Sequence, residues 1–218
     1  MKHKLIILSI PLIFILGSCS SEDIKAAQEL AKLQETAKTI FPAIAGDAYQ
    51  SCLRSADLAI LNTPDAENGQ IDKDRQAAKT SCQKNALAAS KALNDANKVI
   101  IDYLGALGKL AANDLTDFDS EIDSIGTSLQ DLPGLNTSQK KEAIDAGSAI
   151  TKFLFRALTD GYRREELEQA VTTVNNPLKT LITALDGSVK KHYLNGLLEN
   201  EQVAVDNYYK YYLGRVLT

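Results

Sequence analysis

The 218-residue chain carries 24 basic and 28 acidic residues, so its formal net charge at pH 7 is −4. This acidic balance argues against nucleic acid and anionic phospholipid headgroups as partners, because both repel negative charge. The length suits one sizeable domain or two small ones. Ala and Leu are plentiful, and no stretch alternates apolar and polar residues for long. The pattern therefore predicts helix almost throughout.

The chain opens with the features of a secretory signal peptide. Lys2 and Lys4 give a positive start, and residues 5–16 form an apolar run broken only by Ser9 and Pro11. These 12 residues are fewer than the roughly 18 that a helix needs to cross a bilayer. A basic flank, a short apolar run and then small residues are typical of a cleaved signal. The alternative is an uncleaved apolar helix.

Leu16-Gly17-Ser18-Cys19 resembles the lipobox of bacterial lipoproteins, in which small residues precede an obligatory cysteine. The resemblance implies removal of residues 1–18 and acylation of Cys19 with chains such as palmitate. Several acyl chains on one residue give stable membrane anchoring. In Gram-negative bacteria Asp after the lipidated Cys commonly retains such proteins at the inner membrane. Ser20 stands there, so we expect the outer membrane, facing the periplasm, with surface exposure left open.

Cleavage would leave residues 19–23 as the lipidated anchor and residues 24–218 as a single helical-bundle domain. Loss of Lys2 and Lys4 lowers the 24 basic residues to 22 against 28 acidic ones, a net charge of −6. Ser20 or Ser21 suits the cap of a first helix, and Glu22 and Asp23 complement its positive end. Almost no flexible tether remains, so we expect the body to stand close to the membrane.

Two long helices are predicted first. The first carries apolar residues at steps of three and four, with a kink expected near Pro42: Leu30, Leu33, Ala37, Ile40, Ile44, Ala48. Residues 62–69 have the composition of a loop. The second helix carries the stripe Ala78, Cys82, Ala86, Ala89, Leu93, Ala96, Ile100, Leu104, Leu107. Gly105 and Gly108 near its end permit close helix contact.

The second half begins with a short, acidic, amphipathic helix over residues 117–132. Pro133-Gly134 then marks a turn, and Thr137 or Ser138 is expected to cap a third long segment over about residues 138–174. Asp160-Gly161 is a possible division of that segment. Asn176 suits the cap, and Pro177 the first position, of a last helix.

Together these segments predict an all-α protein. Four segments of roughly 38–42 residues would each be about 60 Å long. Their similar lengths favour an elongated antiparallel bundle of about four long helices plus one short connecting helix. The alternative is a set of shorter, folded-back segments divided at Pro42, Gly161 and Gly187.

Cys52 and Cys82 give the sharpest tertiary prediction. With Cys19 lipidated they are the remaining thiols, and an envelope compartment favours their oxidation. Their midpoint, Glu67, falls inside the predicted loop, so their heights on two antiparallel helices differ by only about 3 Å. Both lie on apolar stripes, and we predict a disulfide. The alternatives are two buried thiols or a redox pair, which the absence of a Cys-x-x-Cys motif disfavours.

No residue pattern indicates a reaction centre. His192 is the sole histidine after Cys19, without the further His or Cys ligands that zinc usually needs, and it is interpreted as solvated. There is no Glu-x-x-His element for a di-iron centre and no Cys-x-x-Cys-His motif for haem. The charged clusters are interpreted as solvated helix faces: Asp117/Asp119/Glu121/Asp123, Arg163-Arg164 and Glu165/Glu166/Glu168. We expect no catalytic residue, metal or cofactor.

Four tyrosines gather near the C-terminus: Tyr208, Tyr209, Tyr211 and Tyr212. A helix turns about 100° per residue, so Tyr208 and Tyr212 share a face while Tyr209 and Tyr211 point elsewhere. Tyr is favoured in binding surfaces because it offers area at little entropic cost. The cluster is thus a candidate partner-binding surface, with Tyr209 and Tyr211 the more exposed pair. The alternative is that the tyrosines close the bundle end.

These observations favour a non-enzymatic, lipid-anchored module of the bacterial envelope that binds or spaces another component. Its expected partners are the membrane, through Cys19, and an unknown envelope protein. One alternative is an immunity or exclusion protein directed against a toxin or phage. Another is a small-molecule binder with a pocket inside the bundle.

Overall fold

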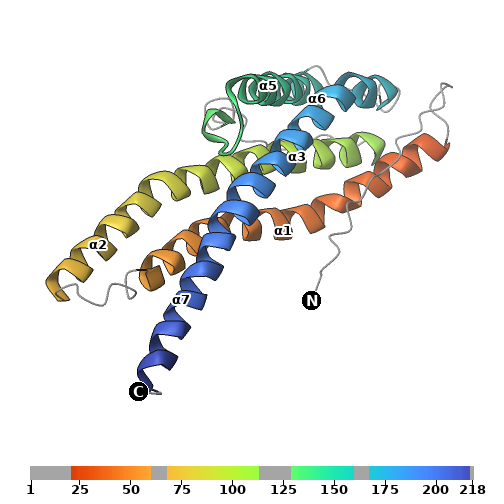
Figure 1. Cartoon of the computed structure of the whole chain (residues 1–218). Helices are drawn as coiled ribbons and strands as arrows, with labels where there is room; N and C mark the ends of the chain where they lie inside the picture. Colours follow the sequence, from red (N-terminus) through yellow and green to blue (C-terminus); the bar gives the residue numbers. More distant parts are fainter. Residues whose placement is uncertain (1–20, 60–67, 113–128, 160–166, 217–218) are drawn as a thin grey trace.

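The computed structural model describes residues 21–59, 68–112, 129–159 and 167–216, and the regular structure in these ranges is helical (Figure 1). The first rod is α1 (Ser21–Ala59). The second joins α2 (Asn68–Ser81), the π-helix η2 (Cys82–Ala86) and α3 (Leu87–Ala112).

The remaining two rods follow a 3₁₀ turn, η3 (Leu129–Asp131). The third is α5 (Thr137–Thr159). The fourth joins α6 (Leu167–Ser188), the π-helix η5 (Val189–Leu198) and α7 (Glu199–Val216). The predicted all-α bundle is confirmed, although its rods are unequal in length.

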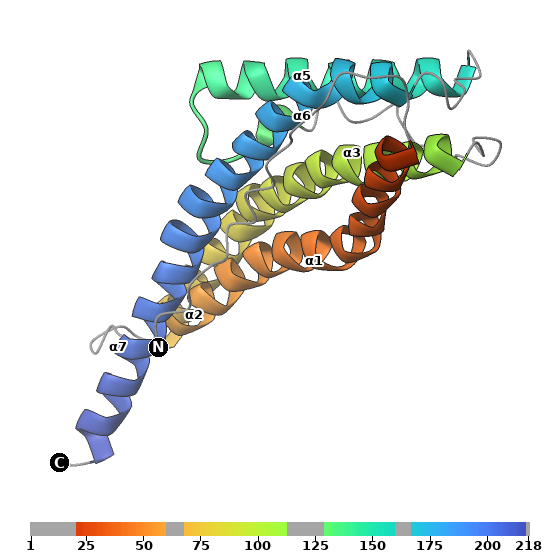
Figure 2. The ribbon, with the colours of Figure 1, turned by 90° about the vertical axis from the view of Figure 1, so that its right-hand side faces the viewer.

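The rods form two helical hairpins. α1 packs along α3 in the opposite direction, and α5 packs on α6. α3 also contacts α5 and α6, whereas η5 and α7 cross onto α1. Both views show the last rod running past the first hairpin, so that the C-terminal part of α7 extends beyond the end of α1 and α2 (Figures 1 and 2).

α3 is the centre of the core. It is buried along most of its length, and its side chains pack against those of α5 and α6, notably Leu93, Val99, Leu107, Ile150, Leu154, Leu167 and Leu181. Tyr103 meets Phe153 of α5 edge-on, with ring centroids 6.3 Å apart. The apolar stripe predicted for the second rod is therefore confirmed, with Ala78 at its start only half-buried.

α1 and α3 approach so closely that small residues fill their contact. A Cβ atom on Gly108 would lie 2.6 Å from the Cβ of Ala31, and one on Gly105 would clash with Gln34. Gln34 donates a hydrogen bond to the carbonyl of Ile101 at 3.2 Å. The close contact expected at the two glycines is confirmed.

The same close approach corrects part of the predicted face of α1, of which Ala37 and Ala48 are buried and Leu30 and Ile44 half-buried. Leu33 and Ile40 are exposed, whereas the buried positions are mostly alanines: Ala27, Ala37, Ala45, Ala48, Ala56. Large side chains do not fit where two backbones lie this near. α1 continues through Pro42 and curves along its length, as a kink rather than a stop predicts (Figure 2).

One predicted boundary is wrong. α5 ends at Thr159 and α6 is already formed at Leu167, so Pro177 lies inside α6 and does not begin the last helix. Val174 and Leu181, on either side of it, are buried in the core, and this packing outweighs the local preference of proline for a helix start. The helix also continues through Gly187, which excludes folded-back segments divided at Pro42 and Gly187.

The turn before α5 is set by a different cap from the one predicted. Asn136, rather than Thr137 or Ser138, accepts from the backbone N–H of Gln139 at 2.9 Å, and the Gln139 side chain accepts from the Asn136 N–H at 3.1 Å. This reciprocal pair is a capping box. Gly134 has a φ of 73°, which suits glycine. Of the predicted helix over residues 117–132, residues 117–128 lie outside the described part.

Candidate functional site

A polar cluster joins the two hairpins where η5 and α7 cross α1. We call it the Arg54 cluster: Asp47 and Arg54 from α1, Tyr193 from η5 and Glu201 from α7. Asp47 and Arg54 are seven positions apart, about two helical turns, which places both on one face of α1. Arg54 Nη2 lies 3.0 Å from Asp47 Oδ1 and 3.0 Å from Glu201 Oε2, and its Nε also donates to Glu201. The Tyr193 hydroxyl donates to Asp47 Oδ2.

The pKa shifts in this cluster keep its ions charged. The Tyr193 hydrogen bond, aided by Arg54, lowers the pKa of Asp47. Hydrogen bonding to Arg54 lowers the pKa of Glu201. Burial, with the bond to Asp47, raises the pKa of Tyr193 to about 12. Each group is thus held in its ordinary protonation state near neutral pH, and the cluster acts as a latch that ties η5 and α7 to α1.

The latch matters because the apolar side chains of η5 and α7 that pack on the bundle, such as Leu194, Leu197 and Val205, are only half-buried. Among the described side chains of residues 189–213, only Ala204 is buried. Ser51, between Asp47 and Arg54 on α1, is fully buried. The two bonds of the Arg54 guanidinium to Glu201 use the fork geometry that suits a carboxylate.

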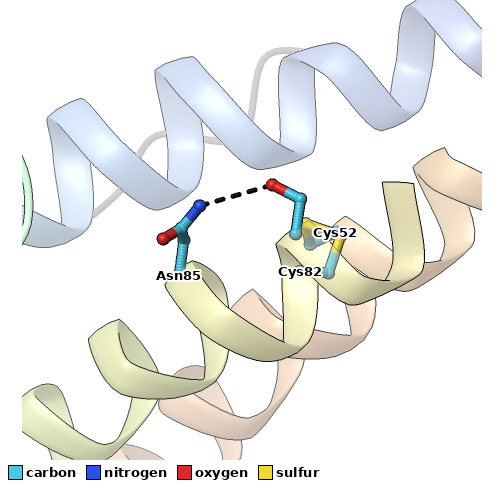
Figure 3. Close-up of a disulfide and its surroundings, with 4 residues drawn as sticks. Cys52, Cys82 and Asn85 are labelled. Carbon is cyan, nitrogen blue, oxygen red and sulfur yellow. Dashed lines mark hydrogen bonds between the residues drawn. A yellow bond between two sulfur atoms is a disulfide. The ribbon is translucent and has the colours of Figure 1, made fainter. Parts of the chain in front are cut away.

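Cys52 and Cys82 join α1 to η2, as their sequence positions predict (Figure 3). Their sulfur atoms are 2.07 Å apart and their Cα atoms 5.8 Å apart. Cys82 is buried at the first residue of the π-helix. One turn on, Asn85 donates to the hydroxyl of Ser81 at 3.3 Å. The disulfide thus fixes the first hairpin near its closed end.

His192 is not the solvated residue that the sequence indicated. It is half-buried in η5, and its Nε2 is buried without a hydrogen-bond partner in the described part of the chain. Burial lowers its pKa. The turn at Gly134 covers it: a Cβ atom on Gly134 would lie 3.7 Å from the His192 Cβ. Within the described ranges, no three His, Cys, Asp or Glu side chains gather as a metal site would require.

The tyrosine segment lies on the projecting part of α7. Tyr208 is half-buried and meets Tyr209 edge-on, with ring centroids 5.7 Å apart. Tyr209 and Leu213 are each 59% exposed, and their spacing of four places them on one face. The side chains of Tyr211 and Tyr212 lie outside the described residues. Tyr209 is exposed, as predicted, and Leu213 joins it in an exposed apolar pair, while the prediction for Tyr211 falls outside the described side chains.

A hollow of about 650 Å³ lies on the outer side of α3, lined by residues such as Leu87, Lys91 and Asn94. Its lining residues come from one continuous rod, and most of them are exposed. It is therefore a surface feature and not the pocket inside the bundle that a small-molecule binder would need.

The Arg54 cluster is not evident from the sequence. Its members from α1 and from the last rod are about 147 residues apart, and each resembles an ordinary surface residue of a helix. One weak sequence signal for the cluster is the spacing within each rod. Asp47 lies about two helical turns before Arg54, and Tyr193 lies about two turns before Glu201.

None of the described helices combines the length and apolarity of a membrane span. Comparison of the chain with protein-family models, curated proteins and solved structures finds no match.

Proposed function

We propose that this protein is a lipid-anchored, non-catalytic helical module of the bacterial envelope that binds another envelope protein through the projecting part of α7. The observation that carries the proposal is the exposure of Tyr209 and Leu213, on one face of a helix that extends beyond the bundle (Figures 1 and 2). Interface cores are enriched in aromatic residues such as Tyr, and the projecting helix end leaves this pair accessible to a partner.

The chemistry of the rest of the molecule supports binding rather than catalysis. The strongest polar cluster pairs each of its ions, and its tyrosine is held protonated. Tyr209 offers a rigid apolar ring with a polar tip, which contributes contact area at little entropic cost. The partner is a protein with a complementary apolar surface.

The anchor sets where this surface acts. α1 begins at Ser21, two residues after Cys19, so a lipidated Cys19 would place the start of α1 at the membrane surface. We place the protein at the outer membrane, facing the periplasm. Cys19→Ala should abolish lipidation and leave uncleaved or mislocalised protein. Mass spectrometry of the native mature protein that finds Cys19 unmodified would contradict the anchor.

The binding surface is tested by cross-linking in intact cells. The double variant Tyr209→Ser, Leu213→Ser should lose most cross-links to the principal partner while its melting temperature changes little, because both side chains are exposed. Ile182→Ser is the matched control, since Ile182 is an exposed apolar residue of α6. Retention of every cross-link by the double variant, or equal loss in the control, would refute the proposed surface.

A further inference from the structure

We propose that residues 193–213, here called the strap, release from α1 and redock while the rest of the bundle stays folded, with the Arg54 cluster as the latch. The strap comprises the greater part of η5 and the described side chains of α7. The proposal depends on the contacts of the strap and is independent of which partner the protein binds.

The first argument is the distribution of apolar burial. α3, α5 and α6 share one core whose members include fully buried Leu93, Leu154 and Leu181. The strap contributes a single buried side chain, Ala204, from among its described residues. Other apolar side chains of the strap, such as Leu194, Leu197 and Val205, are half-buried, and none of them belongs to the core cluster. Releasing the strap therefore exposes less apolar surface than separating α6 from α3, which would open the core. Segments with few buried apolar contacts open at lower free energy than the core.

The second argument is the nature of the strap's attachment. Tyr193 and Glu201 bind α1 through Asp47 and Arg54, whose side chains remain 41% and 43% exposed, while Glu201 is 14% exposed. Water can replace these hydrogen bonds as the strap lifts, so no ion is left buried and unpaired. Partly solvated ion pairs contribute little net free energy, and several must act together to hold a helix. The latch therefore holds the strap through several weak pairs that act together, which makes docking reversible.

The third argument is the position of the pivot. Upstream of the strap, Ser188 is fully buried and donates to the carbonyl of Pro133 at 2.8 Å, and His192 packs beneath Gly134. These contacts fix the end of α6 and the first turn of η5. The strap begins immediately after them, inside a ten-residue π-helix. π-helical geometry is rare and occurs mostly as single turns at functional positions, and Gly196 adds backbone freedom here.

Release has a direct consequence for α1. Ser51 lies on the same face as Asp47 and Arg54 and is fully buried while the strap is docked. Lifting the strap uncovers this narrow, small-residue face and at the same time moves Tyr209 and Leu213 away from the bundle. The latch thus governs the position of the projecting helix end.

Hydrogen–deuterium exchange of the full chain tests the proposal. We expect amides of residues 193–213 to exchange well before those of α3. Arg54→Ala should accelerate exchange in the strap by roughly tenfold, since it removes charge-assisted hydrogen bonds to both carboxylates, and leave exchange in α3 unchanged. Lys32→Ala is the control, because the ion pair of Lys32 in the described part of the chain is with exposed Glu29 on the same helix.

Tyr193→Phe provides a second, milder variant that removes one hydroxyl from the latch and keeps the ring. It should accelerate exchange in the strap in the same direction by a smaller factor. The proposal is overturned if the strap is as protected as α3 in the unmodified protein. It is also overturned if Arg54→Ala and Tyr193→Phe accelerate exchange equally in the strap and in α3, because the strap would then open only with global unfolding.

Discussion

Arg54 holds carboxylates from two helices that are far apart in the chain. Its guanidinium binds Glu201 through two nitrogens and Asp47 through one. An arginine suits this position because its planar fork engages two acceptors at once, which a lysine ammonium does with less directional control. At the scale of single residues, the latch therefore depends on side-chain geometry more than on net charge.

The lowered pKa values of the two latch carboxylates predict how the stability of the protein depends on pH. The pKa values of Asp47 and Glu201 are lower in the folded protein than the values of about 3.9 and 4.3 expected when unfolded. Their contribution to stability is thus complete above those unfolded values and is lost as the pH falls through the lowered folded pKa values. The melting temperature should fall on acidification, and fall less steeply in Asp47→Asn. An unchanged slope in that variant, with Asp72→Asn as the exposed control, would contradict this account.

His192 shows why single residues were difficult to assign from the sequence. Lys190 and Lys191 precede it, a context typical of a solvated surface. Its burial comes from the turn at Gly134, about 58 positions earlier in the chain. The Arg54 cluster could not be predicted for the same reason. A local charge pattern does not indicate which distant helix will pack against the charged residues.

At the scale of elements, two glycines test the packing of α1 on α3, because one is surrounded by open space and the other lies in the close contact between the helices. Gly46→Ala should stabilise the protein by about 0.5–1 kcal/mol, because open space surrounds the position and alanine is the better helix former. Gly108→Ala should destabilise it by about 1–3 kcal/mol, because the new methyl would press on Ala31. Urea denaturation measures both. Stabilisation by both substitutions would show that the two helices are not in close contact.

The disulfide should be the strongest single constraint on the first hairpin. It closes a loop with a sequence separation of 30, which in the chain-entropy model contributes about 3–4 kcal/mol. Replacing both Cys52 and Cys82 with Ala should lower the free energy of unfolding by about that amount. Equal stability of the oxidised protein and the double variant would contradict the prediction, as would peptide mapping that finds both thiols free after export.

Helices could be predicted from the sequence where the spacing of apolar residues follows the helical period without interruption. The stripe from Cys82 to Leu107 follows the helical period and is buried in the structure. Local signals failed where packing opposed them. Pro177 lies within α6 because core contacts on both sides hold the helix, and Leu33 lies outside because alanines take the close contact with α3.

At the scale of the whole molecule, the last rod connects two regions of different character. Its first part, α6, belongs to the core with α3 and α5, and its last part lies on α1 and then extends past the bundle (Figure 2). Because α6 holds the rod in the core, the far end of the rod can present exposed Tyr209 and Leu213 beyond the bundle. The same rod that completes the core presents the proposed binding surface.

Site-specific photo-cross-linking in intact bacterial cells tests the central claim most directly. A photoreactive residue is placed in the full-length protein at position 209 or 213 on the projecting helix, or at position 87, a similarly exposed apolar position on α3. The account predicts a defined adduct with an envelope protein from positions 209 and 213 and none from position 87. No adduct from the projecting helix, or the same adduct from all three positions, would contradict it.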